Sequence, residues 1–273
     1  MQLAALDADA AAIEKSYGLY CAARDWHADE TECARLHRSV ARMQRRRVRR
    51  FLAKTLRPCS QFDVGRVQGR EVVHERAAMC PELQRLLAAP GAAVEAGERL
   101  KDGNTATVAR VESGSRRYVV KRYNAKTGRA RRAWVNGHRL CFRNVPTARP
   151  VALLGSRGSE PAYLVLEDLG GTTLDNHVAR HGLDDATADA VGRLFEALSR
   201  DGLTHRDTKA SNFIVQNGTV SLVDLDALRP ARSRREIAGD RKRFLENWEE
   251  SVAAHFTAAL TRASGESGVD SAT

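Results

Sequence analysis

The sequence predicts an α+β protein with two lobes, a small β-rich N-lobe and a compact helical C-lobe, behind a basic helical N-terminal extension. Three patterns predict this organisation: an arginine-rich helical pattern first, then short alternating strands, then mainly helical periodicity. We expect the extension at 1–60, the N-lobe at 61–168, the C-lobe at 169–262 and a small, polar, disordered tail at 263–273. A chain of 273 residues is long enough to bury a core in such a domain.

The N-terminal extension ends in a run of arginines. Six of residues 42–50 are arginine, and apolar Val40, Met43, Val48 and Phe51 recur among them at roughly helical spacing. Pro58 is expected to stop this helix.

Short strands follow. Residues 105–111 and 117–123 alternate in polarity around a Gly-Ser turn, which predicts a hairpin. A basic helix is expected at 129–141, and another strand at 162–166 runs into residues 167–171.

The last part of the chain has helical signals. Asp184 can cap a helix whose apolar face includes Val191, Leu194 and Leu198. The Asn217-Gly218 pair between two apolar runs predicts a hairpin. A final helix is expected at about 234–260.

The run HRDTKASN at 205–212 carries the most specific chemistry. Its H-x-D-x-x-x-x-N spacing is that of the kinase catalytic loop. In that pattern Asp207 would accept the proton of the substrate hydroxyl, Lys209 would neutralise the transferring phosphate, and Asn212 would offer its amide oxygen to Mg²⁺.

Two further residues suit phosphate and metal binding. Asp224 follows the strand-like run 221–223, so its carboxylate is a candidate Mg²⁺ ligand, since this ion prefers oxygen. Lys121 ends the apolar run 118–120, which matches the strand lysine that holds the ATP phosphates.

The remaining ATP-binding candidates are weaker. Gly103, Asn104 and Thr105 lie where a phosphate-covering turn is expected, although the turn has only one glycine, and Glu167 and Leu169 lie in a hinge-like run. Each piece alone has an ordinary explanation as a turn or a solvated strand end. Together and in this order they predict an ATP-dependent kinase with a protein-kinase-like fold.

Four further runs resemble the bacterial lipopolysaccharide core kinases: VKRYN at 120–124, RAWVNGHRL at 132–140, VPT at 145–147 and DRKRFLENW at 240–248. The resemblance covers roughly residues 101–248. It implies ATP and Mg²⁺ as cofactors. It also implies an acceptor hydroxyl on Kdo or heptose of a lipid-linked core, at the cytoplasmic face of the inner membrane.

A protein kinase is the less favoured alternative. Only residues 225–273 follow Asp224, which leaves little chain for a peptide-binding platform, and no A-P-E motif occurs there. The run DLD at 224–226 stands in place of D-F-G, so the usual phenylalanine switch is absent.

One departure from the kinase pattern motivates a second alternative, a nucleotide-binding pseudokinase or scaffold in cell-envelope glycan assembly. No Asp or Glu occurs between Lys121 and Glu160, so the helix glutamate that pairs with the strand lysine is missing. Either Asn136 or His138 takes its place, or Asp224 holds Lys121 directly.

The formal charge of +10 indicates an anionic partner. This charge is compatible with a solvated basic face, with binding to an anionic membrane and with binding to nucleic acid. Scarce aromatic residues and the lack of a zinc or RNP pattern disfavour nucleic acid. The five scattered cysteines have no C-x-x-C spacing, so reduced thiols are expected. With no long apolar run and no signal-peptide pattern, we expect a cytoplasmic protein that is peripheral to the inner membrane; the sequence leaves its oligomeric state open.

Overall fold

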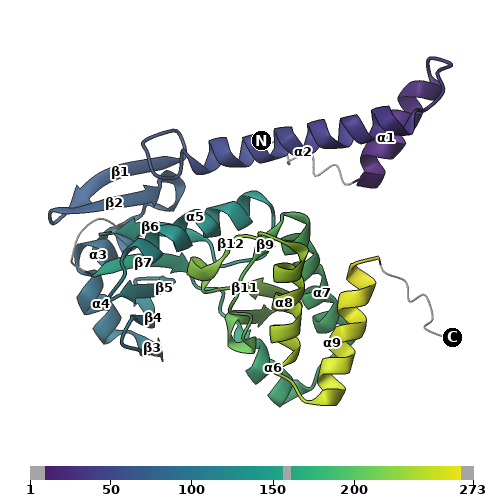
Figure 1. The fold of residues 1–273 in the computed structure, drawn as a ribbon. Coiled ribbons are helices and arrows are strands. Elements are labelled where there is room, and N and C mark those ends of the chain that lie inside the picture. Colours follow the sequence, from purple (N-terminus) through teal and green to yellow (C-terminus); the bar gives the residue numbers. More distant parts are fainter. Residues whose placement is uncertain (1–9, 156–160, 266–273) are drawn as a thin grey trace. The chain divides into compact units, whose positions relative to one another are not determined.

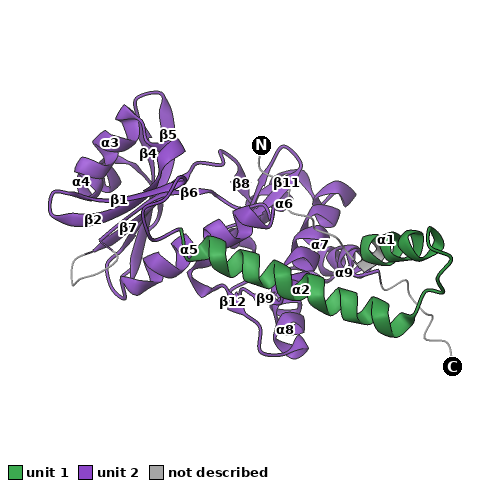
Figure 2. Cartoon of the chain, turned by 90° about the horizontal axis from the view of Figure 1, so that it is seen from above, with its two compact units in different colours: residues 1–54 green, residues 55–273 purple. Residues whose placement is uncertain are grey.

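A computed structural model describes residues 10–155 and 161–265. The chain divides into two compact units, Met1–Lys54 and Thr55–Thr273 (Figure 2). The sequence boundaries at 60, 168 and 262 stay predictions, and residues 266–273 of the expected tail lie outside the described residues.

The first unit contains two helices, α1 (Ala10–Ala22) and α2 (Glu30–Leu52). Asp29 caps α2 by accepting a hydrogen bond from the N–H of Thr31 at 2.7 Å. Glu30 and Glu32 in the first turn and Arg49 and Arg50 in the last turn suit the helix dipole. The helix ends at Leu52, earlier than the predicted stop at Pro58.

The second unit begins with a seven-stranded antiparallel sheet in the order β1-β2-β6-β7-β5-β4-β3 (Figure 1). Its strands are β1 (Phe62–Val67), β2 (Arg70–Glu75), β3 (Glu98–Lys101), β4 (Ala106–Ser113), β5 (Arg116–Tyr123), β6 (Pro150–Leu154) and β7 (Ala162–Glu167). The predicted hairpin is confirmed as β4–β5, with Val108 opposite Lys121. Lys121 also pairs with Leu164 of β7, so it lies on an inner strand.

Two helices occur where the sequence predicted only short strands: α3 (Pro81–Ala88) and α4 (Pro90–Ala96). A proline opens each helix, where its missing N–H costs nothing. Leu83, Leu86 and Leu87 of α3 recur at helical spacing and are buried. They join Val120 of β5 in the hydrophobic core of the N-lobe.

The basic helix expected at 129–141 is confirmed as α5 (Gly128–Phe142). Its Trp134 is fully buried and donates from its indole N–H to the carbonyl of Thr55 at 2.9 Å. It contacts the ring of Phe62 edge-on, at 6.1 Å between centroids. This packing attaches α5 to the chain that enters the sheet.

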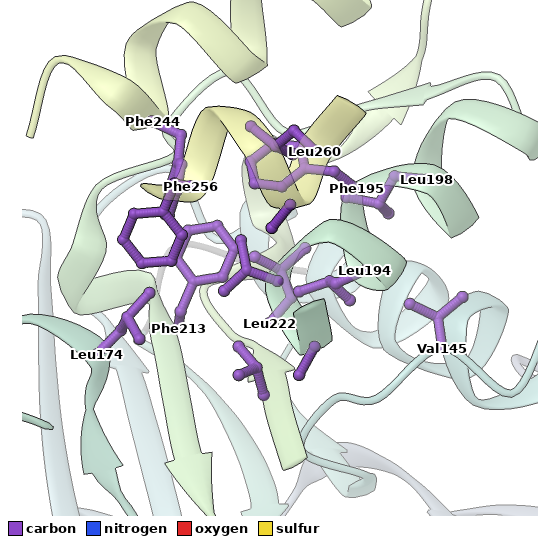
Figure 3. Close-up of a cluster of buried hydrophobic side chains, with 14 of the residues drawn as sticks. Val145, Leu174, Leu194, Phe195, Leu198, Phe213, Leu222, Phe244, Phe256 and Leu260 are labelled. Carbon is purple, nitrogen blue, oxygen red and sulfur yellow. The ribbon is translucent and has the colours of Figure 1, made fainter. Parts of the chain in front are cut away.

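The C-lobe is mainly helical, with a second hydrophobic core. Its helices are α6 (Leu174–His181), α7 (Asp185–Arg200), α8 (Arg234–Leu245) and α9 (Glu250–Ala263). Its short strands are β8 (Thr172–Thr173), β9 (Leu203–Thr204), β10 (Phe213–Gln216), β11 (Thr219–Leu222) and β12 (Arg229–Pro230). In this core the ring of Phe244 meets the rings of Phe213 and Phe256 edge to face, and Figure 3 labels all three residues.

The sequence predictions for this lobe are confirmed in part. Asp184 caps α7 by accepting from the N–H of Thr187 at 2.6 Å, and β10 pairs with β11 across the Asn217-Gly218 turn. The single helix predicted at 234–260 is wrong, because the chain breaks between α8 and α9. The Asn247 amide donates to the carbonyls of Arg243 and Phe244, each at 2.8 Å, and so satisfies the end of α8.

Helices α7 and α9 touch through Gly192. A Cβ at this position would lie 2.7 Å from the carbonyl oxygen of Ala259. Alanine normally favours a helix over glycine by about 1 kcal/mol. We expect the opposite sign here: Gly192→Ala lowers the free energy of unfolding by about 1–3 kcal/mol in urea titrations, because the backbone of α9 must move.

The matched control is Gly18→Ala in α1, where an added Cβ meets no heavy atom of the described residues within 4 Å. It should cause no loss of stability. A Gly192→Ala protein as stable as the parent would contradict the close packing of α7 and α9.

Candidate active site

Lys121 lies on β5 with its side chain only 9% exposed. Its ammonium group donates to the carboxylate of Asp224 and, at 3.2 Å, to the carboxylate of Asp226. It also lies 4.9 Å from the centroid of the Tyr123 ring, two residues along the same strand. The lysine that the sequence selected is therefore held by two acids from the C-lobe segment after β11.

Asp224 follows β11 in a left-handed backbone conformation, with φ 58° and ψ 49°. Such a conformation is uncommon for a residue other than glycine and often marks a functional position. Burial alone would raise the pKa of Asp224, but the charges of Lys121 and Lys101 and the hydrogen bond from Lys121 outweigh it and lower the pKa below its usual value. The carboxylate is thus ionised at neutral pH, as a metal ligand must be.

Asp207, Lys209 and Asn212 lie close together in one loop. Lys209 Nζ lies 3.4 Å from Asp207 Oδ1, and the Asp207 side chain is 39% exposed, which leaves it accessible to an acceptor. The amide nitrogen of Asn212 donates to the Asp207 carbonyl at 2.8 Å, so its oxygen stays for another partner. The Asn212 carbonyl accepts from the N–H of Val223 at 2.9 Å, which joins the loop to the residue before Asp224.

A buried carboxylate from α8 supports this loop. Asp240 Oδ2 accepts from the Thr204 hydroxyl at 2.6 Å and from the His205 N–H at 2.7 Å. Its Oδ1 accepts from the N–H of Arg206 at 3.0 Å and pairs with Arg243. Arg206 has φ 64°, and these bonds hold it there. In the sequence, Asp240 only begins the run at 240–248 that resembles a known family, and nothing there predicted that it would support the loop.

The weaker ATP-binding candidates occupy two other places. Gly103, Asn104 and Thr105 form the turn between β3 and β4, and the Thr105 carbonyl accepts from the N–H of Asn124. Next to this turn, Lys101 Nζ lies 4.0 Å from Asp224 Oδ2. Glu167 ends β7, with Leu169 in the connection to the C-lobe. The sequence did not single out Lys101.

Acids from the segment after β11 take the place of the missing helix glutamate beside Lys121. His138 packs between Phe62 and Trp134, and its burial lowers its pKa to about 3. Asn136 donates to the carbonyls of Leu225 and Leu228 at 2.8 and 2.7 Å. In the part of the chain that the structure describes, neither side chain forms a hydrogen bond or ion pair with Lys121, whereas Asp224 and Asp226 both do.

Sequence reasoning missed Asp226 and its second partner, Arg129. Arg129 Nη2 of α5 donates to Asp226 Oδ1 at 3.0 Å. The lack of acids on α5 could have pointed to Asp226, because a buried lysine needs a carboxylate partner and none is available on that helix.

The residues present fit a nucleotide and a metal ion. Asp224 and Asn212 supply the oxygen donors that Mg²⁺ prefers, and Lys121 and Lys101 supply positive charge for phosphates. A small cavity beside Lys121 and Asp224 has apolar walls that include Ala148, Leu164 and Leu166. The cavity measures only about 30 Å³, so it marks an apolar wall beside the cationic anchor and does not by itself enclose a nucleotide.

Comparisons with known proteins give a family and a similar fold. A sequence model of the lipopolysaccharide kinase (Kdo/WaaP) family matches residues 110–263. The fold is similar to the solved structure described as "WaaP in complex with acyl carrier protein", at 24% identity and a TM-score of 0.51, over 68% of this chain and 88% of that one. No curated protein matches the chain.

Removal of the Asp240 carboxylate should loosen the loop. We expect Asp240→Ala to lower the free energy of unfolding by at least about 3 kcal/mol, because the buried His205 N–H, the half-buried Arg206 N–H and the buried Thr204 hydroxyl lose their acceptor. Urea titrations measure this loss, and hydrogen exchange should increase at 204–212.

The control is Asp189→Ala, which removes a partly exposed pair with Arg262. It should change stability by less than about 1 kcal/mol. Equal losses in the two variants would show that Asp240 does not support the loop.

Proposed function

The chain belongs to the lipopolysaccharide kinase (Kdo/WaaP) family, and from that premise we propose that it transfers the γ-phosphoryl group of ATP to a hydroxyl of Kdo or heptose in the lipopolysaccharide inner core. We further propose that it does so with Mg²⁺, at the cytoplasmic face of the inner membrane. Enzymes of this family are phosphotransferases that act on sugar hydroxyls. The observation that carries the proposal is the convergence of Lys121 from the N-lobe with Asp224 from the C-lobe, next to the loop that holds Asp207.

Each candidate residue has one role in this mechanism. ATP supplies the phosphoryl group, and Mg²⁺ would neutralise the charge on its phosphates. Asn212 and Asp224 would hold the metal ion, and Lys121 would anchor the phosphates. Asp207 would orient the sugar hydroxyl and accept its proton, while Lys209, 3.4 Å from Asp207, would stabilise the charge on the transferring group.

The connection after β7 would hold the base of ATP. Glu167 and Leu169 lie in this segment, and the turn at Gly103, Asn104 and Thr105 would cover the phosphates. In both segments the backbone N–H and C=O groups would make these contacts, so no particular side chain is required. This explains why the sequence pattern at 103–105 and 167–169 is weak.

The pseudokinase alternative is weakened, because the absent glutamate was its motive and Lys121 has two carboxylate partners. The family also disfavours a protein substrate.

Replacement of the proposed base tests the chemistry. Asp207→Asn should lower ³²P transfer from γ-labelled ATP to dephosphorylated lipopolysaccharide core by about 10²–10⁴-fold, the usual loss for a general base, while binding of a non-hydrolysable ATP analogue is kept. Asp189→Asn on the surface is the control and should transfer normally.

Unchanged transfer by Asp207→Asn would remove Asp207 from the mechanism. Absence of label on the core from the wild type, with ATP binding intact, would move the proposal to another acceptor, and label on a generic protein would favour a protein kinase.

The first unit has the features of a membrane-surface hairpin, and we propose that it binds anionic lipid. Every residue of α2, all of which the structure describes, is exposed or half-buried, and most of its charges are arginines. Large apolar side chains of the unit are also exposed, Leu19 at 64%, Trp26 at 56% and Met43 at 60%. Arginines combined with exposed Trp and Leu are typical of a helix that lies in the lipid interface. No helix in the described ranges has the length and apolar character to cross a bilayer.

Charge reversal on α2 tests this contact. Since each Lys or Arg near an anionic leaflet contributes about 1 kcal/mol, the triple variant Arg45→Glu, Arg46→Glu, Arg49→Glu should bind vesicles of anionic phospholipid at least about 100-fold more weakly in co-sedimentation. The control carries three reversals in the second unit, Arg66→Glu, Arg116→Glu and Arg180→Glu, at exposed positions. Equal losses in the two proteins would indicate nonspecific attraction by net charge.

A further inference from the structure

We propose that Asp226, held by Arg129 of α5, is the positioning residue that keeps Lys121 in place for the nucleotide phosphates. This inference rests on the proposed function. Protein kinases hold the strand lysine with a glutamate from the helix that follows the strand. In this chain the helix would supply the cation, and the acid would come from the segment after the metal-binding aspartate.

The geometry connects three elements through one carboxylate. Asp226 Oδ2 lies 3.2 Å from Lys121 Nζ on β5, and Oδ1 lies 3.0 Å from Arg129 Nη2 on α5. The Asp226 side chain is 3% exposed. A carboxylate this deeply buried requires paired cations, and it has one on each oxygen.

Helix α5 binds the same segment at two further points. Arg132 Nε donates to the carbonyl of Asp226 at 3.4 Å, and Asn136 donates to the carbonyls of Leu225 and Leu228. Positions 129, 132 and 136 are separated by three and four residues, so they share one face of the helix. This face carries cationic and amide donors, which complement the acid and the carbonyls of residues 225–228.

Asp224 is a poor permanent partner for Lys121. It is more exposed than Asp226, at 20% against 3%, and Lys101 approaches its other oxygen. Its carboxylate is also the proposed metal ligand, and a carboxylate shared with Mg²⁺ attracts an ammonium group less strongly. Asp226 has no such competing role, so it can hold Lys121 both with and without bound nucleotide.

Lys121 therefore has its carboxylate partners without an acid on α5. Asp224 and Asp226 place two carboxylates around it, and Arg129 and Lys101 bring further positive charge to the same two acids.

The experiment measures nucleotide binding separately from transfer. Asp226→Asn should weaken binding of a fluorescent ATP analogue by at least about 10-fold and raise the KM for ATP. The neutral amide loses the ion pair with Lys121, so the lysine is no longer held in place. The Mg²⁺ concentration for half-maximal transfer should stay within about 2-fold at saturating ATP. Asp224→Asn should show the reverse: a much higher Mg²⁺ requirement and lower kcat, with metal-free analogue binding nearly kept.

A double-mutant cycle tests the link through Arg129. Arg129→Ala should weaken analogue binding less than Asp226→Asn, and the double variant should bind no more weakly than Asp226→Asn alone, because the two residues act through one interaction. Arg131→Ala, on the same helix, is the matched control and should bind normally. Thermal unfolding of each variant checks that it folds, and the conservative changes Asp226→Glu and Arg129→Lys should recover part of the binding even if Asp226→Asn fails to fold.

Three results would overturn the inference. They are normal analogue binding by folded Asp226→Asn, additive losses in the cycle, and a raised Mg²⁺ requirement in Asp226→Asn, which would make Asp226 a metal ligand instead. Wild-type protein that binds the analogue but does not label the core leaves this test intact and removes only the proposed acceptor. Wild-type protein that does not bind the analogue overturns both proposals.

Discussion

The carboxylate of Asp240 accepts hydrogen bonds from the Thr204 hydroxyl and from the N–H groups of His205 and Arg206. The two N–H groups lie in a loop that cannot satisfy them by regular secondary structure, and a buried N–H without an acceptor is costly. The same residue accepts from the Thr208 hydroxyl through its own carbonyl, and Asn247 after α8 donates to the Thr208 carbonyl. The position of Asp207 therefore depends on a helix more than thirty residues further along the chain, and Phe244 anchors that helix in the C-lobe core.

A second set of contacts fixes the segment after Asp224. Leu225 is buried in the C-lobe core, where a kinase with D-F-G would have a movable phenylalanine. Helix α5 holds the backbone of this segment through Arg132 and Asn136. A segment anchored by a buried side chain and by several donors has few alternative arrangements of similar energy. This favours a site that is assembled permanently over one that is switched by movement of α5.

The sequence predicted what depends on local pattern and failed where distant residues decide. The strand before Lys121 and the cap at Asp184 follow from alternation and capping chemistry, and the structure has both. The break between α8 and α9 was missed because periodicity continues through 246–249, while the side chain of Asn247 binds carbonyls at the end of α8 and in the catalytic loop. The absence of acids on α5 reduced the candidate partners of Lys121 to Asn136, His138 and Asp224. It could not reveal the pair of Arg129 with Asp226, because these residues are 97 positions apart and only the fold brings them together. The roles of the individual site residues remain predictions.

The two units use their charges in physically different ways. The arginines of α2 lie in solvent, so their attraction to anions is long-ranged, unselective and screened by salt over about 8 Å at physiological ionic strength. Lys121 and Asp226 are almost completely buried, so their interaction is short-ranged, depends on geometry and is screened much less. The family match begins at residue 110 in β4 and therefore covers the buried charges and none of α2. Changes in sequence outside the match would then alter the surface proposed to bind lipid without altering the geometry of the Lys121–Asp226 pair.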